Sequence, residues 1–190
     1  MITEVQRQQR YNGIGSSDIP ILLGLYEKYG KGREWLVRYK LKQIPEEPPS
    51  EQMEWGVRLE PLIREAVAAQ DGWVVEPDEE THTLSGHEWA YAHPDGRVVV
   101  HPIRQGVGVL EIKNSRYYSA KTGPSDAHIC QLMWQIGVTH ANYGILAVLE
   151  AGQALHITEH EFDQELFDRI FEIAHDTWNS IEHYKQGVGA

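Results

Sequence analysis

The spacing of apolar residues along this chain predicts helices on either side of a strand-rich middle. Apolar positions recur at helical spacing over about 51–70 and 125–138, and again after Asp163, where a long terminal helix is expected. Short apolar or alternating runs predict strands at 73–76, 88–93, 97–101, 107–113, 142–149 and 154–162. Strands enclosed by helices in this order predict an α/β (α+β) fold with a mixed central sheet flanked by helices.

Near the N-terminus the pattern predicts a turn followed by a short helix. Gly13 to Gly15 is expected to be the turn. Ser16, Ser17 and Asp18 are then N-cap candidates for an apolar helix that ends at Gly24, because their short polar side chains accept hydrogen bonds from the first free amides of a helix.

The length is that of about one domain. We expect a single domain over 1–190, made of a basic N-terminal helical segment (1–43), a core (53–162) and a C-terminal helix (163–190). Cys130 is the only cysteine, which excludes an internal disulfide and a four-cysteine zinc or iron–sulfur site. No run of about 18 apolar residues predicts a membrane span, and the first ten residues lack the apolar stretch of a secretory signal. A cytoplasmic setting is expected.

The net charge of −11 is unevenly distributed along the chain. Residues 1–42 hold eight Lys or Arg against four Asp or Glu, a net of +4, whereas the remainder is acidic. This permits a local phosphate-binding face and excludes a generic basic coat. A helix is expected at 33–42, and the alternative is that its basic residues only form a solvated face; they are Arg33, Arg38, Lys40 and Lys42.

Two short motifs in the strand-rich middle indicate a metal site. Pro94-Asp95 is followed, sixteen positions after the aspartate, by Glu111-Ile112-Lys113 on an apolar strand. Side chains alternate along a strand, so Glu111 and Lys113 share a face while Ile112 points the other way. Two converging carboxylates and an ammonium are poor core material but suit a hard divalent cation and a phosphate. The pattern suggests metal-dependent cleavage of a phosphodiester.

Two further residues are candidates for the same centre. Glu60, on the long helix just before Pro61, would add a third acid, and Pro61 is expected to kink that helix or to mark a restart. Gln131, on the helix that follows the motif strand, could hold a phosphate oxygen or the attacking water. The alternative for Glu60 and for Gln131 is an ordinary residue on a helix surface.

Three other groups of residues are candidates for binding anions. Ser16-Ser17 at a helix start, preceded by Arg10, would form an anion cradle, with simple N-capping as the alternative. His93, two residues before Asp95, would touch phosphate or metal. A basic and aromatic loop follows the motif strand and would stack on bases or bind phosphates, unless it is only a surface loop; it contains Arg116, Tyr117, Tyr118 and Lys121.

Four blocks in order resemble the phage lambda exonuclease and YqaJ viral recombinase family of the PD-(D/E)xK nuclease superfamily. They cover about residues 10–150. The blocks are Arg10 to Asp18 with its Gly/Ser segment, Trp55-Gly56 to Glu60-Pro61, His93-Pro94-Asp95-Gly96 with Glu111-Ile112-Lys113, and Gln131 followed by Met133 and Val138-Thr139. Single blocks of this kind are weak signals, and four in register are strong.

The resemblance implies a restriction-endonuclease-like nuclease domain. It also implies 5′-to-3′ digestion of one strand of linear double-stranded DNA from an end in phage-type recombination, with Mg²⁺ or alternatively Mn²⁺. The implied metal ligands are Asp95, Glu111, Glu60 and the backbone carbonyl of Ile112. Lys113 would position or activate water and Gln131 would support that centre. The implied 5′-phosphate ligands are Arg10, Ser16, Ser17, His93 and Gln131, and the implied DNA contacts in the following loop are Arg116, Tyr117 and Lys121.

The resemblance further implies a ring-shaped homotrimer, a single-strand annealing protein as partner, and the cytoplasm of a bacterium or phage-infected host. Two residues depart from the family pattern. Gln6 stands where a tryptophan is frequent, so a strand-separating wedge would come from elsewhere, and His93 stands where lambda-like members have a serine. The alternatives are an endonuclease of the same fold and a catalytically silent DNA-binding subunit; the solitary Cys130 disfavours a Cas4-like nuclease.

Overall fold

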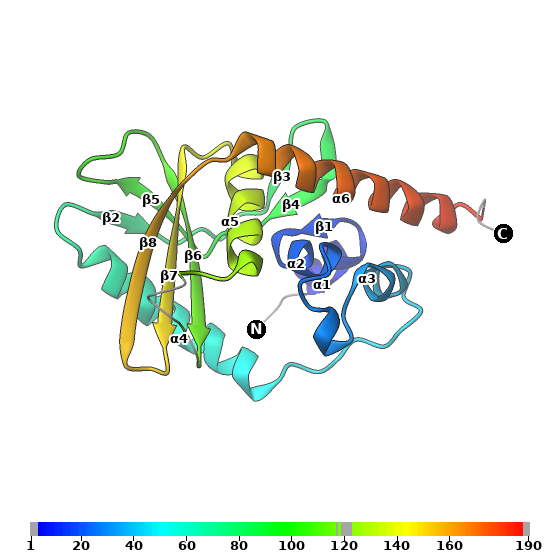
Figure 1. The fold of residues 1–190 in the computed structure, drawn as a ribbon, viewed down its shortest axis with the longest axis horizontal. Coiled ribbons are helices and arrows are strands. Elements are labelled where there is room, and N and C mark those ends of the chain that lie inside the picture. The colour runs from blue at the N-terminus through cyan, green and yellow to red at the C-terminus, as the bar shows by residue number, and fades with distance from the viewer. Residues whose placement is uncertain (1–3, 117, 119–122, 188–190) are drawn as a thin grey trace.

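The computed structural model describes residues 4–116, 118 and 123–187, and the strands in these ranges form two sheets (Figure 1). The larger sheet has the order β2-β5-β6-β7-β8, with β2 (Val74–Glu76), β5 (Gly96–Val100), β6 (Gly108–Ser115), β7 (Tyr143–Glu150) and β8 (Ala154–Glu161). The smaller has the order β1-β4-β3, with β1 (Ile14–Gly15), β4 (His87–Ala92) and β3 (His82–Leu84). The pairs β6–β7 and β1–β4 are parallel and the other neighbouring strands are antiparallel.

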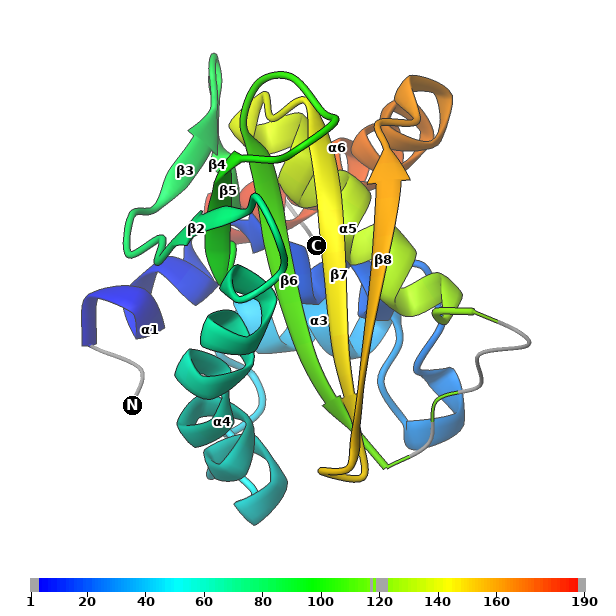
Figure 2. The same cartoon turned by 90° about the vertical axis from the view of Figure 1, so that its left-hand side faces the viewer.

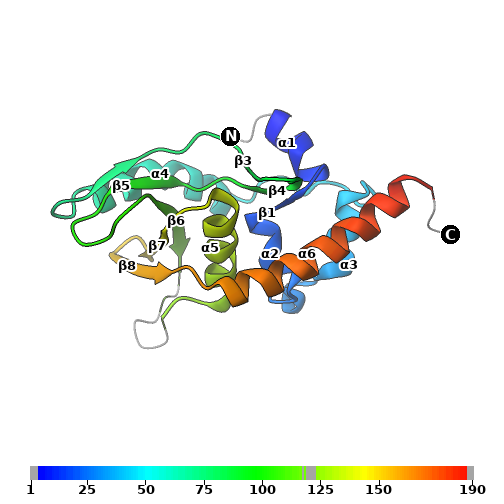
Figure 3. The same cartoon turned by 90° about the horizontal axis from the view of Figure 1, so that it is seen from above.

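Helices cover both sheets. They are α1 (Glu4–Tyr11), the 3₁₀ helix η1 (Ser16–Asp18), α2 (Ile19–Leu22), the 3₁₀ helix η2 (Glu27–Tyr29), α3 (Arg33–Lys40), α4 (Glu51–Ala68), α5 (Asp126–Thr139) and α6 (Gln164–Lys185). Figures 1 and 3 show α1, α2 and α3 on the side of α5 that lies away from the larger sheet, with α6 running past α2 and α3. No helix in the described ranges has the length and apolar character needed to span a bilayer.

The expected class, a mixed central sheet flanked by helices, is confirmed, and a second, smaller sheet lies beside it. β4 and β5 are consecutive in the chain, yet they belong to different sheets. The chain passes between the sheets at Pro94, which has no amide hydrogen to give to a strand ladder. The next amide, of Asp95, donates to the carbonyl of Leu110 at 2.9 Å and so begins the antiparallel pairing of β5 with β6.

The strand β6 separates the two hydrophobic cores of the molecule. Leu110 and Ile112 pack with Ile63 and Val67 of α4 on one face, whereas Val109 packs into the core that contains α5. Figure 2 shows α4 and α5 on opposite faces of the larger sheet. Because β6 and β7 are parallel, a crossover connection is required, and α5 provides it. This places α5 against the face of β6 that carries Val109, Glu111 and Lys113.

The turn expected at Gly13–Gly15 is wrong, because Ile14 and Gly15 form the short strand β1 beside β4. Glycine allows this close approach: a Cβ at Gly15 would lie 2.6 Å from the ring of Tyr91. Of the expected N-caps, Asp18 does take the N-cap position of α2, although its side chain makes no capping hydrogen bond there, whereas Ser16 and Ser17 lie within η1. Gly15 takes the N-cap position of η1, and the Asp18 side chain accepts its amide hydrogen at 2.9 Å.

Two helices differ from the sequence pattern. The helix α1 was not predicted, because its sequence is almost entirely polar and offers no apolar periodicity. The expectation that Pro61 marks a restart is wrong, because α4 is one helix from Glu51 to Ala68 with Pro61 inside it.

Alanine substitutions at two helical glycines are expected to change stability in opposite directions. At Gly137 of α5 an added Cβ would overlap the buried ring of Phe167, so Gly137→Ala should destabilise the protein by about 1–3 kcal/mol. At Gly56 of α4 nothing lies within 4 Å of the new Cβ, so the better helix propensity of alanine should stabilise by up to about 1 kcal/mol. Urea unfolding of both variants measures the change in the free energy of unfolding. Equal shifts of the same sign would contradict the close contact between Gly137 of α5 and Phe167 of α6.

Candidate active site

The two motifs predicted to form a metal site do meet in the structure. Asp95 directly precedes β5, and its Oδ2 accepts a hydrogen bond of 2.7 Å from the backbone amide of Ile112 on β6. Glu111 is almost completely buried, and the Lys113 ammonium forms an ion pair with its Oε1. The alternation expected along β6 is confirmed, since Glu111 and Lys113 share the α5 face while Ile112 packs against α4.

The charges in this cluster shift one another's ionisation. Burial raises the pKa of Asp95 well above its usual value, and the nearby Glu111 carboxylate raises it further, while Lys113 acts in the opposite direction. The pKa of Glu60 is also raised, by burial first and by Glu111 in part, against the lowering effect of Arg64. For Lys113 burial acts to lower the pKa, but Glu111 and Asp95 outweigh it and the pKa is raised. The cluster is therefore an ammonium among carboxylates that repel one another.

Two side-chain amides of α5 hold the Glu111 carboxylate. The Nε2 of Gln131 donates to Oε1 at 2.6 Å, and the Nε2 of Gln135 donates to Oε2 at 2.5 Å. Gln131 is therefore a buried hydrogen-bond donor to Glu111 and not a helix-surface residue. Gln135 is fully buried and was not predicted. The signal for it was a second glutamine four residues later, on the same face of an otherwise apolar helix.

The helix α4 contributes Glu60 and a basic residue that the sequence patterns did not single out. Arg64 lies one turn after Glu60, with 3.5 Å between its Nη1 and the Glu60 Oε1. The same Nη1 donates to the backbone carbonyl of Asp95 at 2.6 Å. Arg64 thus joins α4 to the segment that begins β5. Glu60 itself is partly exposed.

One cavity of about 340 Å³ contains most of the predicted site residues. Of these residues, the ones that line it are Arg10, Ser16, Ser17, Glu60, His93, Asp95, Glu111, Ile112, Lys113 and Gln131. The N-terminal segment and the strands β5 and β6 are far apart in sequence, so this convergence is a property of the tertiary structure. Within the described residues no group of three or more His, Cys, Asp or Glu side chains is already arranged to hold a metal ion.

The residues expected to bind an anion, Arg10, Ser16 and Ser17, also line this cavity, and we call this part of the lining the anion end. Arg10 comes from the last turn of α1, and Ser16 and Ser17 from η1. The alternative of a solvated basic face on α3 is wrong for Lys40, whose side chain is fully buried. Arg33 and Arg38 of the same helix are exposed, as that alternative predicted.

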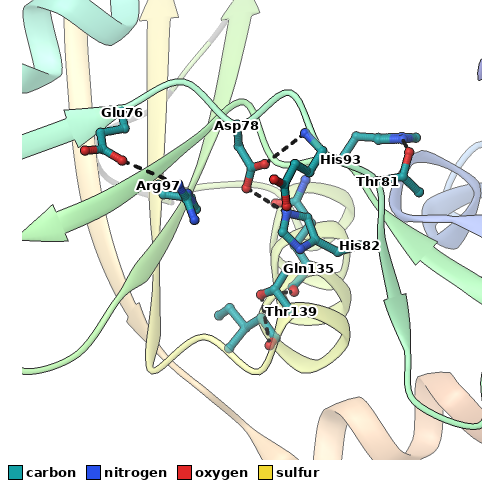
Figure 4. A network of polar contacts seen from close by, with 10 residues as sticks. Glu76, Asp78, Thr81, His82, His93, Arg97, Gln135 and Thr139 are labelled. Atoms are coloured by element: carbon teal, nitrogen blue, oxygen red, sulfur yellow. Dashed lines mark hydrogen bonds and ion pairs between the residues drawn. The ribbon is translucent and has the colours of Figure 1, made fainter.

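His93 also lines the cavity. Its Nε2 lies 2.7 Å from the hydroxyl of Thr81, as Figure 4 shows, and in the same view His82 is joined to Asp78. Burial lowers the pKa of His93, and His82 and Arg10 lower it further. The imidazole is therefore neutral near pH 7 without a bound anion.

The loop after β6 is only partly described. Tyr117 and Lys121 lie outside the described residues, and Arg116 is exposed immediately after β6. Tyr118 fixes the loop to the edge of the sheet, because its amide donates to Glu150 at 3.2 Å and its ring stacks on His156 at 4.4 Å. Of the described residues of this loop, neither Arg116 nor Tyr118 lines the cavity.

Comparison with known proteins places these features in a family. The YqaJ-like viral recombinase domain matches residues 7–142. The uncharacterized protein YqaJ of Bacillus subtilis (strain 168) is 28% identical over 178 residues, which are 90% of this chain. The chain spans about half of that relative, 54% of its length.

Solved structures share the fold. The alkaline exonuclease LHK-Exo from Laribacter hongkongensis matches with a TM-score of 0.72 at 18% identity, covering 98% of this chain and 96% of that one. LHK-Exo in complex with dAMP matches equally well and covers 98% of both chains. A phage-related exonuclease from Haemophilus somnus 129PT matches with a TM-score of 0.69 at 11% identity, covering 93% of this chain and 96% of that one.

The fold expected from the resemblance is thus confirmed. The match over 7–142 contains every residue of β5, of β6 and of the cavity described above. This chain therefore belongs to the family of YqaJ-like viral recombinase domains.

Proposed function

We propose that this protein is a metal-dependent exonuclease that digests one strand of linear double-stranded DNA in the 5′-to-3′ direction. The observation that carries the proposal is the shared cavity, in which the Asp95–Glu111–Lys113 centre and the Arg10–Ser16–Ser17 anion end face one space. The family supports a nuclease of the lambda-exonuclease type, and the fold shared with the two exonucleases agrees with it.

The donor set at the centre fits a hard divalent cation. Carboxylate and carbonyl oxygens are the ligands that Mg²⁺ and Mn²⁺ prefer, and Asp95, Glu111, Glu60 and the Ile112 carbonyl would provide them. The raised pKa values of Asp95 and Glu60 reflect burial and repulsion that a cation between them would relieve. When bound, such an ion would supply a Lewis acid and a water molecule of lowered pKa.

Lys113 would serve the reaction as a cation. Because its pKa is raised, it stays protonated, and the ion pair with Glu111 holds the ammonium at the cavity wall. There it would donate to a phosphate oxygen and stabilise the charge that develops as the phosphodiester is attacked. Gln131 and Gln135 would keep the Glu111 carboxylate in one orientation throughout.

The anion end would bind the 5′-phosphate of a DNA end. A guanidinium and two hydroxyls, from Arg10, Ser16 and Ser17, match the hydrogen-bonding needs of a phosphate, and His93 lies beside them. Binding the terminal phosphate in the cavity that contains the carboxylates would place cleavage close to a 5′ end. The homotrimeric ring, the single-strand annealing partner and the bacterial or phage-infected cytoplasm belong to the same proposal.

Linear duplex DNA with a 5′-phosphate should be degraded in the presence of Mg²⁺. The digested strand should lose a label at its 5′ end before a label at its 3′ end. Asp95→Ala should lower the rate by about a thousandfold, which corresponds to about 4 kcal/mol of lost transition-state stabilisation. Gel analysis of 5′- and 3′-labelled strands measures both results.

Covalently closed circular DNA is the control substrate, because an exonuclease leaves it intact and an endonuclease of this fold does not. A wild-type protein that binds neither Mg²⁺ nor Mn²⁺ by calorimetry and leaves linear DNA intact would identify a silent DNA-binding subunit instead.

Asp95→Asn should stabilise the metal-free protein at higher pH. The pKa of Asp95 is raised above its usual 3.8 in the folded state. In the pH window between the unfolded and the folded pKa of this carboxyl, the folded protein therefore binds more protons than the unfolded chain. Its stability therefore falls as pH rises through the window, and asparagine removes that loss. Thermal unfolding in EDTA from about pH 5 to about pH 9 measures the difference. Asp71→Asn, at an exposed site, is the control, and parallel curves for wild type and Asp95→Asn would refute the expectation.

Gln135→Met should lower kcat by about 10- to 100-fold with little change in KM, because Glu111 loses the donor to its Oε2 while the volume is kept. The control is Thr177→Val, which removes a fully buried hydroxyl that bonds only within α6. Steady-state kinetics and calorimetric titration with Mn²⁺ measure both variants. Equal activity of the two variants would show that Gln135 matters only for packing.

A further inference from the structure

A fully buried lysine lies behind the anion end of the cavity. The side chain of Lys40, the last residue of α3, has 0% exposure. Its Nζ lies 2.5 Å from Oδ2 of Asp18 and donates to the backbone carbonyl of Arg10 at 2.6 Å. The same Asp18 oxygen accepts the amide hydrogen of Gly15. One ammonium and one carboxylate therefore bind three points of the chain segment 10–18.

This arrangement costs free energy that an apolar core would not cost. Burial lowers the pKa of Lys40, and Asp18 restores only part of that loss. A buried ion pair is often replaced by apolar residues without loss of stability, so its presence is weak evidence for a stabilising role. What apolar side chains cannot provide is a fixed direction for the carbonyl of Arg10 and for the amide of Gly15.

The Arg10 carbonyl, the Gly15 amide and Asp18 are fixed in the segment that supplies the anion end of the cavity. Arg10 begins the segment and Asp18 ends it, and Ser16 and Ser17 stand between; Arg10 and both serines line the cavity. Lys40 and Asp18 do not line it. Other contacts hold the same segment against its neighbours without reaching the cavity: the Tyr11 ring packs on Tyr39 at 5.1 Å.

We propose that the Lys40–Asp18 pair is a positioning device that sets Arg10, Ser16 and Ser17 for recognition of the 5′-phosphate at a DNA end. The inference rests on the proposed function, because it assigns a task to the anion end of that cavity. Lys40 acts through its neighbours and touches no substrate. The pair should therefore govern discrimination between 5′-phosphate and 5′-hydroxyl ends, and leave the carboxylate centre unaffected.

The experiment compares three variants with wild type. Lys40→Met removes one charge and leaves Asp18 buried without its partner, so it tests the pair at a cost in stability. The double variant Lys40→Met/Asp18→Leu removes both charges and keeps the site apolar, so it is expected to remain folded. Arg38→Met is the matched control, since it removes a positive charge from an exposed position of the same helix.

The measurement is the ratio of kcat/KM for two linear duplexes that differ only in a 5′-phosphate or a 5′-hydroxyl. In the double variant this ratio should fall by about 10- to 100-fold, the usual effect of losing hydrogen bonds to a charged group. The fall should come from a higher KM for the phosphorylated end. Cleavage of the hydroxyl end and Mn²⁺ affinity by calorimetry should stay at wild-type values, and Arg38→Met should keep the ratio.

The outcomes separate this inference from the proposed function. A wild-type preference for 5′-phosphate that the double variant retains overturns the positioning role and leaves the exonuclease proposal intact. A double variant that no longer folds shows a purely structural pair and also overturns it. If the wild-type enzyme digests linear DNA without preferring a 5′-phosphate, the anion end does not recognise that phosphate. This result overturns the positioning role as well.

Discussion

The structure is organised around two carboxylates that lie together where β5 and β6 adjoin, with Glu111 buried and Asp95 half-buried. Asp95 and Glu111 repel one another, so each needs donors that the fold must deliver. The backbone amide of Ile112 serves Asp95, while Lys113 and the amides of α5 serve Glu111. This requirement explains why the largely apolar helix α5 carries two buried glutamines and why it packs against the face of β6 that carries Glu111.

A second buried ion pair, Lys40 with Asp18, lies outside the cavity and holds the segment 10–18, which supplies Arg10, Ser16 and Ser17 to the cavity lining. The two charged clusters differ in what they do with their partners. At the carboxylate centre the donors leave an excess of negative charge facing the cavity. At the N-terminal segment the pair is internally neutral and only orients the backbone around Arg10. The cavity thus brings groups that suit a cation and groups that suit an anion into one space, which the proposed cleavage near a DNA terminus would use.

The patterns along the chain predicted the fold class, most strands and the meeting of Asp95 with Glu111, because alternation and hairpin spacing are local properties. They did not predict β1, which depends on two glycines that lie against β4, or the separation of β4 and β5 into two sheets. Gln135, Arg64 and Lys40 were missed for a related reason. Each looks like a surface residue in sequence, and only its packing reveals a partner.

By itself the sequence determined the chemistry of this protein: a carboxylate-rich centre with one lysine, an arginine and serine segment, and the strand alternation that turns Glu111 and Lys113 to one face. The tertiary structure decided which of these groups share a space. Residues 10–18 and 95–113 are joined only when α3, α5 and both sheets have packed, because the contacts between them are long-range. Local pattern carries the side-chain type and its face, whereas burial and the choice of partner arise from the whole fold.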